Sequence, residues 1–169
     1  MSRRVTQIAL AACVLAAGLV LAAPASARTI RLGWTEKTPA PYYGFIAMTF
    51  KVRSVTVTPS GWSVQAEMIN RSGKRITFRR ATSFFPPRVG FGLRAPRPRV
   101  VGRRDFVELR ATTFTPSLPE SLEPGRRWSG RFSGRGRLPR RKPITVTFGV
   151  FLVNSTDPFS WETQRRFRL

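Results

Sequence analysis

Histidine is absent from this sequence of 169 residues, and cysteine occurs once, as Cys13. A serine or cysteine nucleophile that relies on a histidine base is therefore excluded. The usual histidine and cysteine zinc sites are excluded as well, and no metal or other cofactor is expected. Acidic residues are scarce, with 8 Asp and Glu against 30 Lys and Arg, which gives a formal net charge of +22. Such an excess attracts polyanions, and the attraction weakens as salt screens it.

The first 27 residues have the three parts of a secretory signal peptide. Arg3 and Arg4 come first, an apolar run from Ile8 to Ala23 follows, and Ala25-Ser26-Ala27 is a small-residue cleavage site. The apolar run is shorter than the roughly 20 residues that a membrane-spanning helix needs. We therefore expect cleavage after residue 27 and a location outside the cytoplasm, either secreted or in the cell envelope.

Two variants of this signal are open. Ser2-Arg3-Arg4 begins like a twin-arginine signal, but Val5-Thr6-Gln7 lacks the apolar residues that normally follow, which favours the ordinary route. Leu10-Ala11-Ala12-Cys13 is similar to the lipid-attachment box of bacterial lipoproteins. Because the apolar run continues for ten residues beyond Cys13, a cysteine within a discarded signal is the favoured interpretation.

Removal of the signal would leave residues 28–169, which have the size of one domain and contain no cysteine. Packing without disulfides must then hold an exported fold. The segment 28–43, with Pro39 and Pro41, has no sustained period and is expected to be a lead-in to a β-domain at 44–169. Without Arg3 and Arg4, 28 of the 30 basic residues remain against 8 acidic ones, a net charge of about +20.

Short runs of alternating apolar and polar residues predict strands in the mature chain. Trp62 to Met68 alternates as a half-buried strand, and a one-residue shift of the pattern at Arg53-Ser54 predicts a bulge. The longest alternation runs from Ile144 to Leu152. Because Phe151 and Val153 are apolar on its other face, we expect this strand to be central. With no sustained helical spacing, the pattern predicts an all-β, antiparallel β-sandwich of roughly seven to nine strands.

The sequence RRWSGRFSGRGRLPRR, from Arg126 to Arg141, holds seven arginines and no acidic residue. At period two, Trp128, Phe132 and Leu138 fall on one side with glycines between them, while arginines and serines fall on the other. A disordered tail has no reason to alternate in this way. We therefore expect a strand with an aromatic inner face and a row of arginines on its outer face.

Two turn-and-strand motifs are similar to those of secreted, immunoglobulin-like bacterial β-sandwich domains. The first is Leu122-Glu123-Pro124-Gly125 followed by Trp128, Gly130 and Phe132, and the second is Trp62 to Asn70 followed by Arg71-Ser72-Gly73. The resemblance covers roughly Phe45 to Leu169, without the cysteine pair of antibody domains. It implies an immunoglobulin-like fold in an extracytoplasmic setting. Such domains are commonly accessory or binding modules, so the resemblance implies no particular ligand.

Carboxylate pairs of the kind that glycosidases need are few. The close pairs are Asp105 with Glu108, and Glu120 with Glu123. An odd spacing on a strand puts Asp105 and Glu108 on opposite faces. Glu120 and Glu123 stand between prolines and near arginines. Surface ion pairs are therefore the favoured interpretation of all four.

Other polar and aromatic residues have structural explanations. Ser72 and Lys74 could form a catalytic pair, but an exposed hairpin turn explains both. Asn70-Arg71-Ser72 and Asn154-Ser155-Thr156 match the glycosylation acceptor pattern, although a signal of bacterial type favours ordinary turn residues. The aromatic residues of the lead-in are expected to fasten it to the sandwich rather than to form a stacking surface. They are Trp34, Tyr42 and Tyr43.

These observations predict a non-enzymatic, basic β-sandwich that binds an anionic partner at the envelope: a phosphate-containing polymer, a membrane surface or an acidic protein. The expected anion-binding residues are Arg127, Arg131, Arg135, Arg137, Arg140 and Arg141. Alternatively, these arginines only protect a sheet edge from pairing. Nucleic-acid binding is permitted by the charge and disfavoured by export. A carboxylate-dependent enzyme acting on glycans is the least favoured function.

Overall fold

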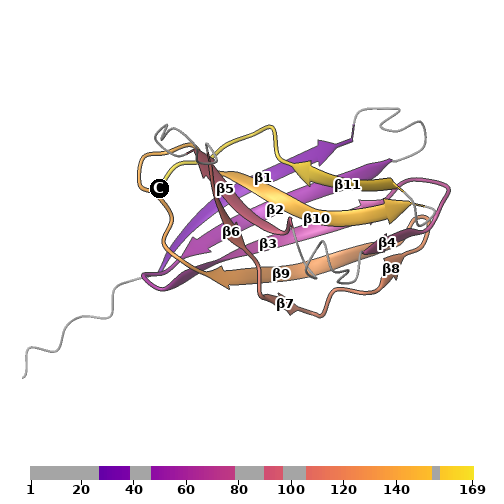
Figure 1. Cartoon of the computed structure of the whole chain (residues 1–169), viewed down its shortest axis with the longest axis horizontal. Helices are drawn as coiled ribbons and strands as arrows, with labels where there is room; N and C mark the ends of the chain where they lie inside the picture. The colour runs from indigo at the N-terminus through magenta and orange to yellow at the C-terminus, as the bar shows by residue number, and fades with distance from the viewer. Residues whose placement is uncertain (1–26, 39–46, 79–89, 97–105, 154–156) are drawn as a thin grey trace, which may run out of the picture.

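The computed structural model describes residues 27–38, 47–78, 90–96, 106–153 and 157–169. Within these ranges every regular element is a β-strand, and no helix is long and apolar enough to cross a membrane. Two antiparallel sheets form a β-sandwich (Figure 1). The all-β antiparallel fold expected from the alternation of apolar residues is therefore confirmed.

The first sheet has five strands in the order β1-β2-β3-β9-β7. Their bounds are β1 (Arg28–Lys37), β2 (Met48–Val57), β3 (Gly61–Asn70), β7 (Thr113–Thr115) and β9 (Arg127–Arg135). The second sheet has the order β6-β5-β10-β4-β8, with β11 also paired to β10. Its strands are β4 (Ile76–Phe78), β5 (Gly92–Pro96), β6 (Phe106–Arg110), β8 (Ser121–Leu122), β10 (Thr145–Val153) and β11 (Asp157–Glu162). The total exceeds the expected number because several strands have only two or three residues.

Strand β10 is central to the second sheet, as its sequence predicts. It pairs with β11 along one edge and with β5 and then β4 along the other. One detail of its expected pattern is wrong. The register shifts between Phe148 and Phe151, so both of these rings are buried in the core and Val150 is only half-buried. The irregularity breaks the simple alternation that the sequence suggests.

The bulge predicted in the first sheet is confirmed, because the register of β2 against β3 shifts between Val52 and Ser54. The expectation of an irregular lead-in at 28–43 is wrong for its first ten residues, which form β1. Ile30, Leu32 and Trp34 alternate toward the core with a period of two. Three apolar residues are a short pattern, and Pro39 and Pro41 follow it closely, which is why the sequence alone favours a lead-in.

Trp34 packs against the core, with its ring centroid 6.4 Å from that of Phe167. This contact fits the expected fastening role for Trp34. The companion residues Tyr42 and Tyr43 lie outside the described residues.

Aromatic rings from both sheets meet in the centre of the sandwich. The Phe148 ring of β10 lies 4.8 Å from the Phe50 ring of β2 and 5.8 Å from the Phe132 ring of β9. Beyond the apolar area that they bury, such pairs each contribute about 1 kcal/mol. Because Phe132 is completely buried, the core fixes the orientation of β9 and therefore the direction of its outward side chains.

Candidate anion-binding site

Strand β9 alternates as predicted. Trp128 and Phe132 are buried, whereas Arg127, Arg131 and Arg135 are exposed on the opposite face. We call these three residues the arginine row. Since a strand rises about 3.3 Å per residue, successive arginines of the row stand about 13 Å apart along it. Ser129 and Ser133 occupy the positions between them.

The middle of the arginine row lies inside the sheet and not at its edge. Strand β9 pairs with β3 over its whole length, from Arg127 to Arg135. Residues 131–133 also pair with β7 on the other side. Edge protection therefore does not account for Arg131, whose backbone has a partner strand on both sides.

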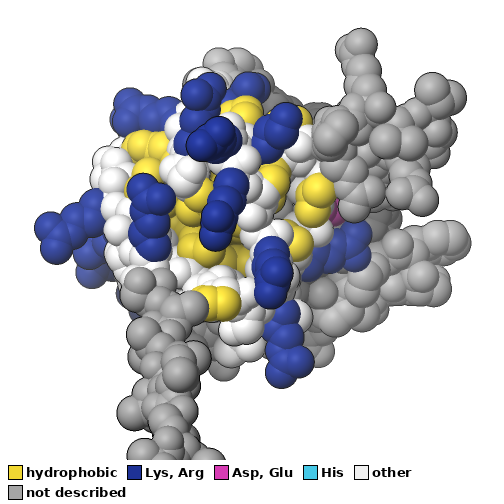
Figure 2. Space-filling model, turned by 90° about the vertical axis from the view of Figure 1, so that its left-hand side faces the viewer, with side chains coloured by type: hydrophobic (Ala, Val, Ile, Leu, Met, Phe, Trp, Pro, Cys, Tyr) yellow, Lys and Arg dark blue, Asp and Glu magenta, His cyan; other side chains and the backbone are white. Residues whose placement is uncertain are grey.

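The other three predicted arginines follow the end of β9 and do not continue the row. Arg137, Arg140 and Arg141 instead contribute to an open pocket of about 920 Å³, which we call the end pocket. Its lining residues are Arg28, Val57, Thr58, Pro59, Arg137, Leu138, Arg140, Arg141 and Leu169. Figure 2 looks onto this end of the molecule and shows Lys and Arg side chains standing around hydrophobic ones.

Backbone pairing holds the walls of the end pocket. Arg28 of β1 lies opposite Val57 of β2 in the sheet. The N–H of Gly136 donates to the carbonyl of Ser60 at 3.2 Å, which ties the loop after β9 to the β2–β3 turn. The C-terminal segment is held by a reciprocal backbone pair between Ile144 and Phe167, at 2.8 and 3.0 Å. Four separate segments of the chain thus meet at one rim.

The opposite end of the arginine row opens into a second cationic pocket of about 480 Å³. Its lining residues are Ile69, Arg71, Gly125, Arg126 and Arg127. The sequence-based site omitted Arg71, Arg126 and Arg28. Arg71 follows β3 directly. Because β3 pairs antiparallel with β9, the end of β3 lies beside the start of β9, and a prediction of this pairing would have placed Arg71 there.

None of the six predicted arginines forms an ion pair with an acidic side chain that the structure describes. The described ion pairs use other cations: Glu108 pairs with Arg110, Glu123 with Arg75, and Glu162 with Arg94. Glu36 accepts hydrogen bonds from the backbone N–H groups of Gln164 and Arg165 at 3.0 and 3.1 Å. The positive charge of the six arginines is therefore not cancelled by direct ion pairing with these carboxylates.

Glu67 on β3 is the acidic residue closest in register to the row. Its side chain is only 3% exposed and contacts Lys51 at 3.0 Å and Arg53 at 3.2 Å. Burial alone would raise the pKa of this carboxyl. Hydrogen bonds from Lys51 and Arg53, and the positive charges of Lys51 and Arg127, nevertheless hold its pKa below the ordinary value of 4.5. Glu67 therefore remains ionised at neutral pH and anchors two neighbouring cations.

We expect Glu67→Gln to lower the free energy of unfolding at pH 7 by about 2 kcal/mol, the scale of hydrogen bonds to a charged group. Because folding lowers the pKa of Glu67, its stabilisation is complete above the unfolded-state pKa and is lost as pH falls through the folded-state pKa. The difference between wild type and variant should therefore shrink in acid. Urea unfolding at several pH values measures it. Equal destabilisation by Glu123→Gln, at an exposed ion pair, would contradict a special role for Glu67.

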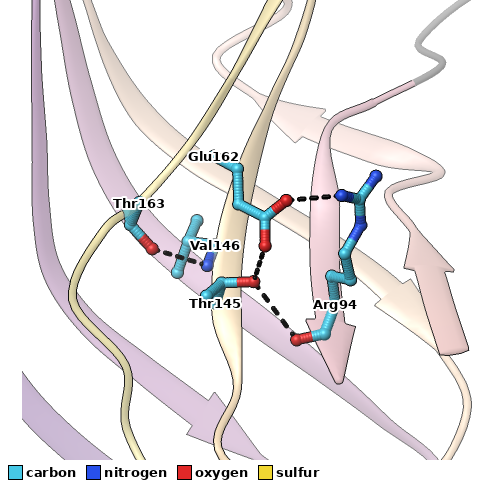
Figure 3. Close-up of polar contacts among 5 residues, drawn as sticks. All are labelled: Arg94, Thr145, Val146, Glu162 and Thr163. Atoms are coloured by element: carbon cyan, nitrogen blue, oxygen red, sulfur yellow. Dashed lines mark hydrogen bonds and ion pairs between the residues drawn. The ribbon is translucent and has the colours of Figure 1, made fainter. Parts of the chain in front are cut away.

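A polar cluster on the second sheet joins three strands (Figure 3). Glu162 of β11 pairs with Arg94 of β5 and accepts a hydrogen bond from the Thr145 hydroxyl of β10 at 2.6 Å. The Arg94 guanidinium carbon also lies 4.2 Å from the centre of the Phe106 ring. Thr163 accepts a hydrogen bond from the Val146 N–H at 3.0 Å. These contacts satisfy the Glu162 carboxylate and cross-link the sheet, and sequence reasoning did not single them out.

The residues considered for catalysis occupy separate places. Glu108 lies on β6 beside Arg110, Glu123 pairs with Arg75, and Glu120 is exposed in the loop before β8. Asp105 lies outside the described residues. Within the described part of the chain, no three His, Cys, Asp or Glu side chains gather where they could hold a metal ion.

The turn after β3 differs from the exposed hairpin that the sequence suggested. Lys74 is exposed, but Ser72 is buried and its hydroxyl contacts the Asn70 side-chain oxygen at 2.6 Å. Asn70 is completely buried, so its amide is not accessible to a glycosylating enzyme in the folded protein. The buried side chains of Asn70 and Ser72 therefore stabilise this turn through hydrogen bonds with its own backbone. Asn154, the other acceptor motif, lies outside the described residues.

Comparisons with known proteins found no match for this chain. No protein-family model matches the sequence, and neither a curated protein nor a solved structure matches the chain.

Proposed function

We propose that the protein is an exported, non-enzymatic binding module whose arginine row holds a linear, phosphate-containing polyanion of the cell envelope. The observation that carries this proposal is the exposed row of Arg127, Arg131 and Arg135 on a paired strand, free of ion pairs with described acids. The cationic pocket at the Arg127 end lengthens the positive surface. Guanidinium groups bind phosphate oxygens through paired hydrogen bonds, so a row of them suits a repeating polyanion.

An immunoglobulin-like topology is the second part of this proposal. In that fold one sheet has the strand order A-B-E-D and the other contains C-F-G. The order β2-β3-β9-β7 corresponds to the first sheet, and β5-β10-β11 corresponds to the second. Strand β1 would then be an addition at the edge beside β2. This agreement supports an immunoglobulin-like sandwich without a disulfide.

Export is the third part, and it rests on the signal-peptide pattern of residues 1–27. The first described strand begins at Arg28, directly after the expected cleavage position. Cleavage there would leave every described strand in the mature protein. An extracytoplasmic location favours envelope polymers over nucleic acid as the partner.

The test compares a variant that lacks the arginine row with a control variant that loses the same number of positive charges elsewhere. The variant Arg127→Ser, Arg131→Ser, Arg135→Ser loses three exposed cations of β9. The control Lys37→Ser, Arg165→Ser, Arg166→Ser also loses three exposed cations, none of them on β9. Binding to long-chain inorganic polyphosphate, measured over a range of salt concentrations, should weaken at least tenfold in the row variant and much less in the control.

The salt dependence separates a localised site from general charge. Each arginine that contacts a phosphate adds about 0.7 to 0.9 to the slope of log affinity against log salt. The row variant should therefore lose a slope of about 2 to 3 relative to wild type. Equal weakening of both variants would show that only net charge matters and would overturn the proposal. Tighter binding of duplex DNA than of polyphosphate would favour the nucleic-acid alternative.

A further inference from the structure

The end pocket differs from the arginine row in having apolar lining. The row alternates with serine along β9. The end pocket combines its arginines with Val57, Pro59, Leu138 and Leu169. Leu138 belongs to the core, and Val57 and Leu169 pack against it. The apolar floor is therefore continuous with the sandwich core.

The rim of the end pocket carries a concentrated positive charge. Arg28, Arg137, Arg140 and Arg141 line it, and none of the nine lining residues has an acidic side chain. The side chains that line the pocket therefore include four positive charges and no opposing one. A phosphate group has the charge and the oxygen atoms to be bound by several guanidinium groups together.

The backbone at Arg141 supports a binding role for this rim. Arg141 has a φ of 60°, in the left-handed region that residues other than glycine, asparagine and aspartate seldom adopt. Arg140 and Arg141 lie in a turn, and both of them line the end pocket. Backbone strain of this kind clusters at binding sites, where surrounding structure maintains it.

From these features we infer that the end pocket binds a phosphate group carried on an apolar chain, with the phosphate at the arginine rim and the chain on the apolar floor. The volume of about 920 Å³ falls in the range of small-molecule pockets. This site is separate from the arginine row and does not depend on the polyanion proposal. Both a soluble alkyl phosphate and the headgroup of an anionic lipid have this chemistry.

Calorimetric titration with inorganic phosphate, butyl phosphate and octyl phosphate tests the apolar part, with octyl phosphate kept below its critical micelle concentration. Each methylene that leaves water completely should tighten binding up to about fourfold. Octyl phosphate should therefore bind at least tenfold more tightly than inorganic phosphate. Leu169→Ser, at a half-buried position, should reduce this dependence on chain length. Equal affinity for all three ligands would overturn the inference.

Arginine variants test the charged part and separate it from the row. Arg140→Ser with Arg141→Ser should weaken octyl phosphate binding at least tenfold, whereas the row variant Arg127→Ser, Arg131→Ser, Arg135→Ser should leave it unchanged. If the row variant alone loses polyphosphate binding, the two sites are distinct. Loss of octyl phosphate binding in the row variant, or its retention in the Arg140 and Arg141 variant, would overturn the assignment to the end pocket.

Vesicles distinguish the two sources of the ligand. Phosphatidylcholine vesicles with and without phosphatidic acid are compared in a sedimentation assay. Binding to the acidic vesicles as well as to octyl phosphate, both lost in the Arg140 and Arg141 variant, would support the inference with a membrane lipid as the source. Binding to octyl phosphate alone would support it with a soluble ligand. Binding to acidic vesicles alone would overturn it, because general surface attraction would then suffice.

Discussion

Gly149→Ala is expected to lower the free energy of unfolding by about 3 kcal/mol, at the upper end of overpacking costs. A Cβ at Gly149 would lie 1.9 Å from the Cε2 atom of Phe91 and 2.7 Å from its Cζ atom. The Phe91 ring is 2% exposed and cannot move aside, because rings of Phe78, Phe132 and Phe148 surround it. Urea unfolding of the variant and wild type measures the change.

Two further variants test whether the clash between the added Cβ and the Phe91 ring causes the loss of stability. Gly73→Ala, where nothing lies within 4 Å of the added Cβ, should change stability by no more than about 0.5 kcal/mol. Combining Gly149→Ala with Phe91→Leu should destabilise less than the sum of the two single changes, because the smaller side chain makes room. Strict additivity would show that the ring contact does not explain the requirement for glycine.

Asn70→Ala is expected to lower the free energy of unfolding by roughly 3 kcal/mol, since several buried polar groups would lose their partner. The Asn70 amide donates to the carbonyls of Lys74 and Leu122, each at 2.8 Å. Its side-chain oxygen accepts from the N–H of Ser72 at 2.9 Å and from the Ser72 hydroxyl. One side chain thus joins the β3–β4 turn to β8. Thermal and urea unfolding measure the loss.

Two further variants, Asn70→Asp and Ser72→Ala, test this prediction more closely. Asn70→Asp preserves shape but cannot donate to both carbonyls, and it buries a negative charge. Its destabilisation should therefore grow as pH rises through the carboxyl pKa and diminish in acid. Ser72→Ala should cost less than Asn70→Ala because it leaves both amide donations intact. Similar stability of Asn70→Asp at all pH values would contradict the contacts described for this side chain.

The sheet fold and the arginine row could be predicted because both depend on local alternation. Trp128 and Phe132 reveal the inner face of β9, and the arginines between them follow from a period of two. The same reasoning failed at Phe151, where an irregular register brings a second aromatic ring into the core. It also failed for β1, where the alternation of Ile30, Leu32 and Trp34 is regular but only three apolar residues long.

The end pocket could not be predicted because it depends on long-range assembly. Arg28, Val57, Arg137 and Leu169 come from four segments that only the strand order brings together. Local patterns show that a side chain faces outward, but they do not show which other side chains stand beside it. The sequence-based set therefore joined Arg137, Arg140 and Arg141 to the row, although they surround a pocket.

The outer side of β1 is a long edge of the first sheet within the described part of the chain. Strand β1 pairs with β2 on one side, and no strand that the structure describes pairs with its other side. Arg31 and Lys37 are exposed along this strand, and Gly33, with a φ of 60°, interrupts its regular course. Charge and irregularity both discourage strand addition by another molecule. The edge protection considered for the arginines of β9 is therefore expected at β1 as well, where like-charged edges would repel one another.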